Sequence, residues 1–281
     1  MRLLSYVDAR GTEGFGAVSE DGSTVSDLRV GEITSMQQAL AQWGVDGLKE
    51  RARPARAAAR LDEVEVLPPI PRPGKILCVG FNYAAHTAEV AQEQPQHPAI
   101  FTRFPESLVA HGRDLRMPEV SSQFDYEAEL AVVIGAPAYR LSEADAWSAV
   151  AGYACLAENS VRDWQKHSRQ ATAGKNFFQS GAWGPWLVTA DEIEEPEKLE
   201  VIGRLNGREV QRDHVGHMVF SIPRIISYIS TFIPLAPGDV IATGTPAGVG
   251  VFQDPPRYLR PGDVFEVEIP RVGLLRNRVG A

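Results

Sequence analysis

Residues 125–135 have the sequence Asp125-Tyr126-Glu127-Ala128-Glu129-Leu130-Ala131-Val132-Val133-Ile134-Gly135, and the expected architecture rests on this segment. Its run of small and β-branched apolar residues, closed by glycine, is typical of a strand that enters a hydrophobic core. Side chains two residues apart on a strand share a face, so Asp125, Glu127 and Glu129 are predicted to line one side at a spacing of about 7 Å. Like charges beside buried apolar neighbours destabilise a fold unless something neutralises them. The segment therefore predicts a cation site, with a solvent-exposed strand edge or an arginine partner as the simpler alternatives.

A third carboxylate, at Glu158, completes the predicted ligand set with Glu127 and Glu129. Carboxylate oxygens without a nearby cysteine suit hard ions such as Mg²⁺, Mn²⁺ or Ca²⁺ better than zinc or copper. If the segment after residue 158 is helical, Glu158, Arg162 and Gln165 share one face and offer an acid for the ion and two donors for an anionic ligand. The alternative is that Glu158 and Arg162 form an ordinary surface pair.

Two further motifs supply candidate polar groups. His86 and Glu89 are three residues apart, so on a helical turn the carboxylate can orient the imidazole as a general base toward water. The alternative is a surface pair without a catalytic role. The glycine-rich segment 243–250 lacks the features of a phosphate loop or a dinucleotide fingerprint and predicts no nucleotide site. Its hydroxyls and amides, including those of Gly244 and Thr245, can still hold a carboxylate.

The composition excludes several classes of partner. The chain has 28 basic and 36 acidic residues, a formal net charge of −8. Nucleic-acid surfaces and anionic membranes both require clustered Lys and Arg, so neither is an expected partner. Cys78 and Cys155 lie in apolar, strand-like contexts and are predicted to be buried free thiols, which favours a reducing cytoplasm. The first eight residues reach a charge too soon for a signal peptide, and no apolar run is long enough to span a bilayer.

A proline-rich segment divides the chain. Four prolines among residues 68–74 predict an extended linker, and hence a small N-terminal domain at 1–67 and a larger catalytic domain at 68–281. In the first part, the pattern predicts a helix over about 36–60, interrupted near Gly44. With 25 glycines and 20 prolines scattered along the chain, the sequence favours a turn-rich, mainly antiparallel α+β fold.

Together these motifs resemble the fumarylacetoacetate hydrolase superfamily over nearly all of residues 70–281. The resemblance rests on Gly80-Phe81-Asn82-Tyr83 with His86 and Glu89, Asp125-Tyr126-Glu127-Ala128-Glu129-Leu130, Arg162-Asp163-Trp164-Gln165, Gly184-Pro185-Trp186, Asn206-Gly207 with Gln211, and residues 237–246. It implies a mixed β-roll catalytic domain that is usually homodimeric and carries a small N-terminal domain. It also implies an Mg²⁺ or Mn²⁺ ion held by Glu127, Glu129 and Glu158, a His86–Glu89 dyad on a lid segment, and substrate contacts near Arg162, Gln165, Lys175 and Thr245.

One position departs from the family pattern. Members commonly have Asn-Asp where this chain has Ala157-Glu158, so the third predicted ligand is a glutamate. The extra methylene preserves oxygen ligation but shifts the ion or the backbone, and it marks a subgroup whose substrate cannot be assigned by analogy.

The resemblance and the motifs together predict a hydrolase that acts on a 2-oxo acid. An ion-bound acylpyruvate, such as maleylpyruvate or fumarylpyruvate from aromatic-compound catabolism, would be attacked by water that His86 deprotonates with the help of Glu89. Lys175 would stabilise the departing pyruvate enolate. The same enolate would arise in an oxaloacetate decarboxylase or in an isomerase of the 2-hydroxyhepta-2,4-diene-1,7-dioate type. A metal-stabilised binding protein without catalysis has no use for the dyad.

Overall fold

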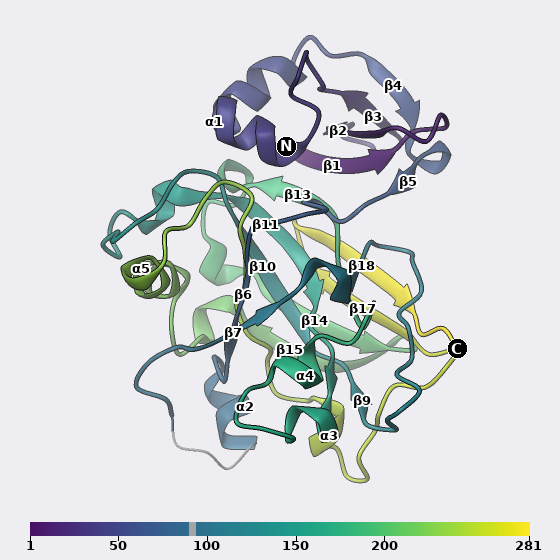
Figure 1. The fold of residues 1–281 in the computed structure, drawn as a ribbon, viewed down its shortest axis with the longest axis vertical. Helices are drawn as coiled ribbons and strands as arrows, with labels where there is room; N and C mark the ends of the chain where they lie inside the picture. The colour runs from purple at the N-terminus through teal and green to yellow at the C-terminus, as the bar shows by residue number, and fades with distance from the viewer. Residues whose placement is uncertain (90–93) are drawn as a thin grey trace.

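The computed structural model describes residues 1–89 and 94–281 (Figure 1). The N-terminal segment forms a layer of short strands under one helix. Its elements are β1 (Arg2–Val7), β2 (Glu13–Val18), β3 (Thr24–Asp27), α1 (Met36–Ala52), β4 (Ala57–Arg60) and β5 (Glu65–Val66). Ser35 caps α1, and Gly44 interrupts it with a φ of 62°, as the sequence predicts. The predicted extension of this helix to residue 60 is wrong, because residues 57–60 instead pair with β3 as strand β4.

Twelve strands of the described residues form one large sheet. Its strands run in the order β4-β3-β2-β1-β13-β11-β10-β16-β6-β7, with β5 beside β1 and β8 beside β13. The strands after the N-terminal layer are β6 (Ile76–Gly80), β7 (Ala99–Arg103), β8 (Leu108–Val109), β10 (Ala128–Ile134), β11 (Val150–Ala157), β13 (Gly181–Thr189) and β16 (Val240–Ala242). Since β1 pairs with β13, the N-terminal layer extends the same sheet. The domain boundary between residues 67 and 68 stays a prediction.

A smaller sheet and a few helices complete the fold. The second sheet has the order β15-β14-β17-β18, formed by β14 (Glu200–Leu205), β15 (Arg208–His214), β17 (Val264–Ile269) and β18 (Gly273–Arg278). A two-stranded ladder joins β9 (Phe124–Asp125) to β12 (Ser160–Val161). The remaining helices are α2 (Ala84–Glu89), α3 (Arg162–Gln165), α4 (Thr172–Lys175) and α5 (Ile222–Phe232). Most strand pairs are antiparallel, which confirms the predicted α+β class.

Strand β10 lies between the two largest hydrophobic clusters and is buried along its whole length. Leu130, Val132 and Ile134 face the cluster that includes α5 and the second sheet. Ala131 and Val133 face the cluster covered by α1. Burial of a Val, Leu or Ile side chain contributes roughly 1.5–3 kcal/mol, so packing on both faces fixes the position of this strand firmly. Any charged group at its start is therefore carried into the interior.

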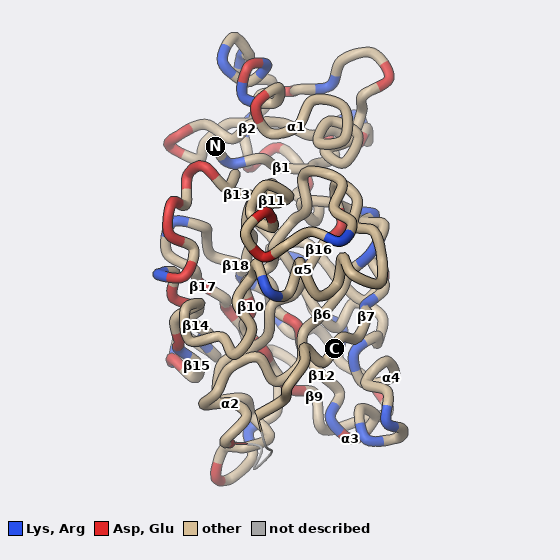
Figure 2. The backbone as a smooth tube through the Cα atoms, turned by 90° about the vertical axis from the view of Figure 1, so that its left-hand side faces the viewer, with Lys and Arg blue, Asp and Glu red and all other residues tan. Residues whose placement is uncertain are grey.

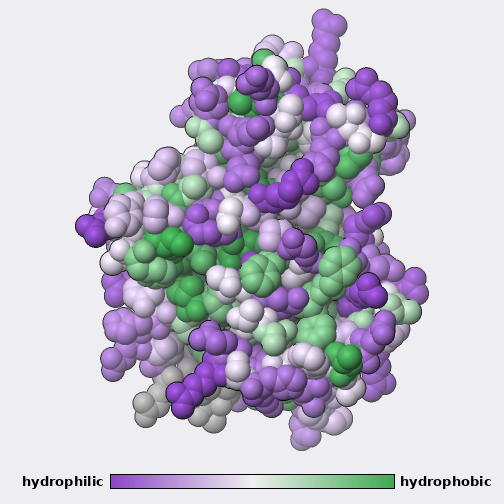
Figure 3. Space-filling view, viewed as in Figure 1, coloured by the Kyte–Doolittle hydropathy of each residue, from purple (hydrophilic) through white to green (hydrophobic). Residues whose placement is uncertain are grey.

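The surface has both polar and apolar regions. On the face shown in Figure 3, apolar side chains gather around α5 and across the middle of the molecule. Phe104, Phe178 and Phe232 are among the large apolar side chains exposed to solvent. No helix in the described part of the chain is both long and apolar enough to cross a membrane.

Candidate metal centre

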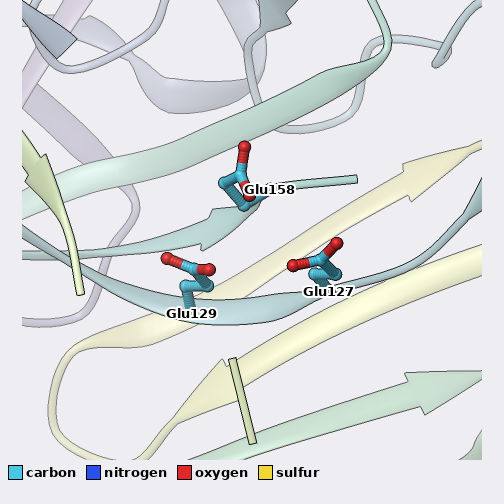
Figure 4. Close-up of side chains that lie close together, drawn as sticks. All are labelled: Glu127, Glu129 and Glu158. Carbon is cyan, nitrogen blue, oxygen red and sulfur yellow. The ribbon is translucent and has the colours of Figure 1, made fainter. Parts of the chain in front are cut away.

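Three buried glutamates converge where strands β10 and β11 meet. Glu127 directly precedes β10, Glu129 lies within it, and Glu158 directly follows β11. Antiparallel pairing sets Ala128 opposite Ala157, and the amide of Glu158 donates to the carbonyl oxygen of Glu127 over 2.9 Å. One carboxylate oxygen from each glutamate lies within 4.8 Å of the others. Figure 4 shows the three carboxylates turned toward a common space, which can hold a metal ion.

Two sequence-based placements around this cluster are wrong. Glu158 does not open a helix, because it directly follows strand β11 and helix α3 begins only at Arg162. Asp125 does not lie on one continuous strand with Glu129, because β9 ends at Asp125 and β10 begins only at Ala128, and Asp125 stays outside the glutamate cluster. Asp125 instead accepts hydrogen bonds from Arg162 Nε over 2.8 Å and from the amide of Gly250 over 2.7 Å. The arginine partner considered as an alternative is thus present at Asp125.

Three buried cations surround the carboxylates. Lys175 Nζ lies 2.9 Å from Glu127 Oε1 and also contacts Glu158 Oε2. Arg162 Nη1 lies 3.0 Å from Glu127 Oε1. Arg103 Nη1 donates to Glu158 Oε1 over 2.8 Å. Among the described residues, Glu129 is the one member of the triad that has no cationic partner.

This uneven pairing separates the acidities of the triad. Burial raises the pKa of Glu127, but Lys175 and Arg162 outweigh it and lower that pKa to about 2. Burial raises the pKa of Glu129 well above its usual value, and the carboxylates of Glu158 and Glu127 raise it further. The pKa of Glu158 is also raised by burial, against the opposing effect of Lys175 and Arg103. Hard oxygen donors fit a divalent cation, and such an ion would compensate Glu129, which has no cationic partner among the described residues.

The turn after β16 holds carboxylates through its backbone amides, as the sequence predicts for segment 243–250, but these carboxylates belong to the protein itself. The amide of Gly244 donates to Glu129 Oε2 over 2.9 Å, and the amide of Gly248 donates to Glu89 Oε1 over 3.1 Å. Gly248 has a φ of +103°, and a Cβ at this position would lie 2.1 Å from the carbonyl oxygen of Val210. Only glycine fits there without strain.

Thr245 is already hydrogen-bonded within the protein. Its hydroxyl donates to the carbonyl oxygen of Ala128 over 3.0 Å and accepts from Gln211 Nε2 over 2.8 Å. Because the amide of Gly244 is also engaged, both residues support the strand that carries Glu129. Direct substrate contacts by Thr245 and Gly244 stay a prediction.

The predicted dyad forms on helix α2. His86 Nδ1 lies 3.1 Å from Glu89 Oε2, which leaves Nε2 as the ring nitrogen not used in this contact. The His86 ring is buried and stacks on Phe81 at a centroid distance of 6.2 Å. Since Glu89 is itself held by the amide of Gly248, the dyad and the glutamate triad are supported by the same turn. The role of this segment as a lid stays a prediction.

A cavity of about 210 Å³ brings most of the predicted residues together. Eight of the ten predicted site residues line it, namely His86, Glu127, Glu129, Glu158, Arg162, Gln165, Lys175 and Thr245. Glu89 and Gly244 lie behind this lining, in contact with His86 and Glu129. The apolar part of the lining includes Val79, Ile100 and Phe101, and Lys175 Nζ lies 5.2 Å from the centre of the Phe101 ring. The cavity therefore combines a candidate ion site, a candidate base and an apolar wall.

Sequence reasoning missed Arg103. Its guanidinium is fully buried and contacts Glu158 Oε1, the carbonyl oxygen of Asn159 and the hydroxyl of Ser180. Its partner Glu158 lies 55 residues away, and nothing in the local sequence identifies the pair. Arg169, which also lines the cavity, was missed because nothing in the local sequence places it there.

The sequence of the chain matches one family model and is similar to several characterised proteins. The family model described as "Fumarylacetoacetate (FAA) hydrolase C-terminal" matches residues 75–280. The chain is 43% identical to oxaloacetate tautomerase YisK of Bacillus subtilis (strain 168) over 224 residues, which cover 78% of this chain and 74% of that protein. It is 36% identical to the mitochondrial oxaloacetate tautomerase fahd2 of Xenopus laevis over 291 residues, covering 99% and 90% of the two chains.

A similar solved structure includes a metal ion. The fold matches that of maleylpyruvate hydrolase from Sphingobium sp. SYK-6, solved in complex with manganese(II) ion and pyruvate, with a TM-score of 0.81 and 27% sequence identity. The match covers 100% of this chain and 99% of that chain.

Proposed function

The chain belongs to the fumarylacetoacetate hydrolase family, and on this basis we propose that it is a metal-dependent enzyme that interconverts the enol and keto forms of oxaloacetate. Its membership bears out the resemblance carried by the sequence motifs and the expected β-roll fold. One observation carries the proposal: the glutamate triad and the His86–Glu89 pair line or support a single cavity. Moving one proton requires one base beside a polarised carbonyl, and this arrangement supplies both.

The chemistry follows from the residues around the cavity. Mg²⁺ or Mn²⁺ held by Glu127, Glu129 and Glu158 would supply Lewis-acid polarisation of the 2-oxo group. His86, oriented by Glu89, would transfer the proton between C3 and the oxygen on C2 of the substrate. This transfer leaves the atoms and the net charge of oxaloacetate unchanged, so no second reactant is needed.

Lys175 would have an electrostatic role in this reaction. Its ammonium lies between Glu127 and Glu158, which keeps it charged and fixed in place. Positive charge already oriented at the site stabilises an oxygen that gains negative charge as the C3 proton leaves. Arg162 and Gln165 line the same cavity, and they would orient the carboxylate next to the 2-oxo group.

Hydrolysis of an acylpyruvate, the reaction first inferred from the sequence, becomes the second candidate. It is favoured by the structural match to a maleylpyruvate hydrolase. The relatives from Bacillus subtilis and Xenopus laevis, at 43% and 36% identity, are more similar to this chain in sequence than the maleylpyruvate hydrolase is, at 27%. Both are named oxaloacetate tautomerases, which supports isomerase chemistry over hydrolysis. Decarboxylation of oxaloacetate is a third outcome of the same chemistry, since it passes through the same kind of enolate.

One experiment separates these reactions. The purified protein is stripped of metal, reloaded with Mg²⁺ or Mn²⁺, and mixed with freshly dissolved enol-oxaloacetate while the enol absorbance is followed. A tautomerase accelerates the loss of enol absorbance without releasing carbon dioxide or pyruvate. Maleylpyruvate, fumarylpyruvate and acetylpyruvate are tested in parallel for pyruvate formation. Cleavage of an acylpyruvate without any effect on the oxaloacetate enol would overturn the proposal in favour of the hydrolase.

We also propose that the chain forms a homodimer. Solvent-exposed aromatic side chains such as Phe104 and Phe178 are costly for a monomer to present and are common in subunit interfaces. Sedimentation velocity gives the mass in solution directly. A single species at 30.7 kDa would contradict the dimer.

A further inference from the structure

The cavity contains a cation that the proposed chemistry at the ion site does not use. Arg162, Arg169 and Lys175 are the basic lining residues apart from His86. Arg162 pairs with Asp125 and Glu127, and Lys175 pairs with Glu127 and Glu158. Arg169 forms no ion pair with any carboxylate in residues 1–89 or 94–281. Its charge is therefore available to a ligand.

The segment that carries Arg169 is locally basic in an acidic protein. Residues 162–175 contain four Lys or Arg residues and one acid, whereas the whole chain has a net charge of −8. Figure 2 shows these basic positions along α3, α4 and the connection between them. Arg169 lies in this connection, after α3 ends and before α4 begins. A local reversal of charge at the edge of a cavity attracts anionic ligands and holds them there.

The remaining lining adds carboxylates and apolar side chains to this cation. Glu127, Glu129 and Glu158 lie together in the cavity, where the 2-oxo acid group would bind. Val79 and Ile100 line an apolar wall that suits a short carbon chain. A monocarboxylic 2-oxo acid would leave the Arg169 guanidinium without a partner. A dicarboxylic 2-oxo acid would place its second carboxylate beside it.

Building on the proposed function, we infer that Arg169 binds the distal carboxylate of the substrate and makes the enzyme selective for dicarboxylic over monocarboxylic 2-oxo acids. Arginine suits this role because its planar guanidinium can donate two parallel hydrogen bonds to a carboxylate. Arg169 touches the part of the substrate that does not react, so it is a specificity residue and the proton transfer itself does not depend on it.

Equilibrium binding of unreactive analogues tests the inference without turnover. Malate and 2-hydroxybutyrate both present a 2-hydroxy acid to the ion site, but only malate carries a second carboxylate. Each is titrated into the Mn²⁺-loaded protein by calorimetry. We expect the wild-type protein to bind malate about tenfold more tightly, a typical effect of one charge-assisted contact. Arg169→Gln should abolish this preference and leave the affinity for 2-hydroxybutyrate unchanged.

Lys166 provides a matched control in the same segment. It is exposed, carries the same charge and does not line the cavity, so Lys166→Gln should leave both affinities unchanged. Arg169→Lys should retain part of the preference for malate. Raising the ionic strength should weaken malate binding more than 2-hydroxybutyrate binding, because the contact at the cavity edge is screened by salt.

The outcomes separate this inference from the proposed function. The selectivity role would be overturned if Arg169→Gln and Lys166→Gln had equal effects. It would also be overturned if Arg169→Gln weakened the binding of both analogues alike. If Arg169→Gln abolishes the preference for malate but the wild-type protein does not accelerate enol-oxaloacetate loss, the inference stands and the proposed reaction fails. If Mn²⁺-loaded wild-type protein binds neither analogue, both are overturned.

Discussion

Replacing Glu129 with glutamine is expected to stabilise the metal-free protein and to abolish its response to metal. Glu129 is 2% exposed and has no cationic partner among the described residues. Its only described polar contact is the hydrogen bond from the amide of Gly244, which a glutamine side-chain oxygen can also accept. Glu129→Gln therefore preserves shape and hydrogen bonding while removing a buried charge that two neighbouring carboxylates disfavour.

The size and the pH dependence of this effect follow from the raised pKa of Glu129. The unfolded chain has an ordinary glutamate pKa near ~4.3. In the window above that value, the folded protein binds more protons at this site than the unfolded chain, so the site destabilises the fold increasingly as pH rises. At pH 8.5 we expect the variant to be more stable by about 2 kcal/mol, which corresponds to a Tm increase of about 4 °C. At pH 5, only slightly above the unfolded pKa, the difference should be smaller, about 1 kcal/mol.

Thermal unfolding of both proteins at the two pH values, with EDTA or with excess Mn²⁺, provides the test. An ion present at about 100 times its Kd stabilises the folded state by about 2.7 kcal/mol, so the wild-type Tm should rise by about 5 °C at pH 8.5. The Tm of Glu129→Gln should not change when Mn²⁺ is added. Glu194→Gln removes an exposed glutamate and should match the wild-type protein throughout. The electrostatic argument would be refuted if, with EDTA at pH 8.5, Glu129→Gln were less stable than the wild-type protein. It would also be refuted if Mn²⁺ still raised the Tm of the variant.

Three further predictions concern the residues around the triad. His86→Ala should reduce turnover more than about 100-fold while leaving the Mn²⁺-induced Tm shift intact, and equal loss of both would show that the dyad is misassigned. Glu158→Asp should weaken Mn²⁺ binding about tenfold in calorimetry, because the shorter side chain cannot reach both Arg103 and the ion, and an unchanged Kd would contradict this. Gly248→Ala should lower the free energy of unfolding, measured in urea, by roughly 3 kcal/mol. The reason is that the added Cβ would clash with the carbonyl oxygen of Val210 and that alanine would be held at a positive φ. An unchanged urea midpoint would show that the turn can adjust.

Local patterns were sufficient to predict the parts of the fold whose determinants lie close together in sequence. The apolar run after Glu129 predicts strand β10, which is buried along its whole length. The three-residue spacing of His86 and Glu89 was enough to predict their contact, because a single helical turn enforces it.

Where tertiary pairing outweighs local preference, the sequence predictions were wrong. Residues 57–60 have an alanine-rich, helix-favouring sequence but pair with β3. Asp125 follows the same alternation as Glu127, yet the strand is interrupted between β9 and β10 and Asp125 lies outside the glutamate cluster. Arg103 carried no local signal because its role exists only once β7 and the end of β11 are brought together.

The backbone turn that follows β16 makes the proposed metal centre tolerant of substitutions in this loop but sensitive to insertions and deletions. Glu129, Glu89 and Asp125 are each anchored by peptide N–H groups of residues 244–251. Exchanging side chains there, where the backbone permits it, leaves those anchors in place, because the anchors are peptide groups and not side chains. Removing or inserting a single residue would instead displace several anchors at once, and we expect evolution to tolerate changes of identity in this loop far better than changes of length.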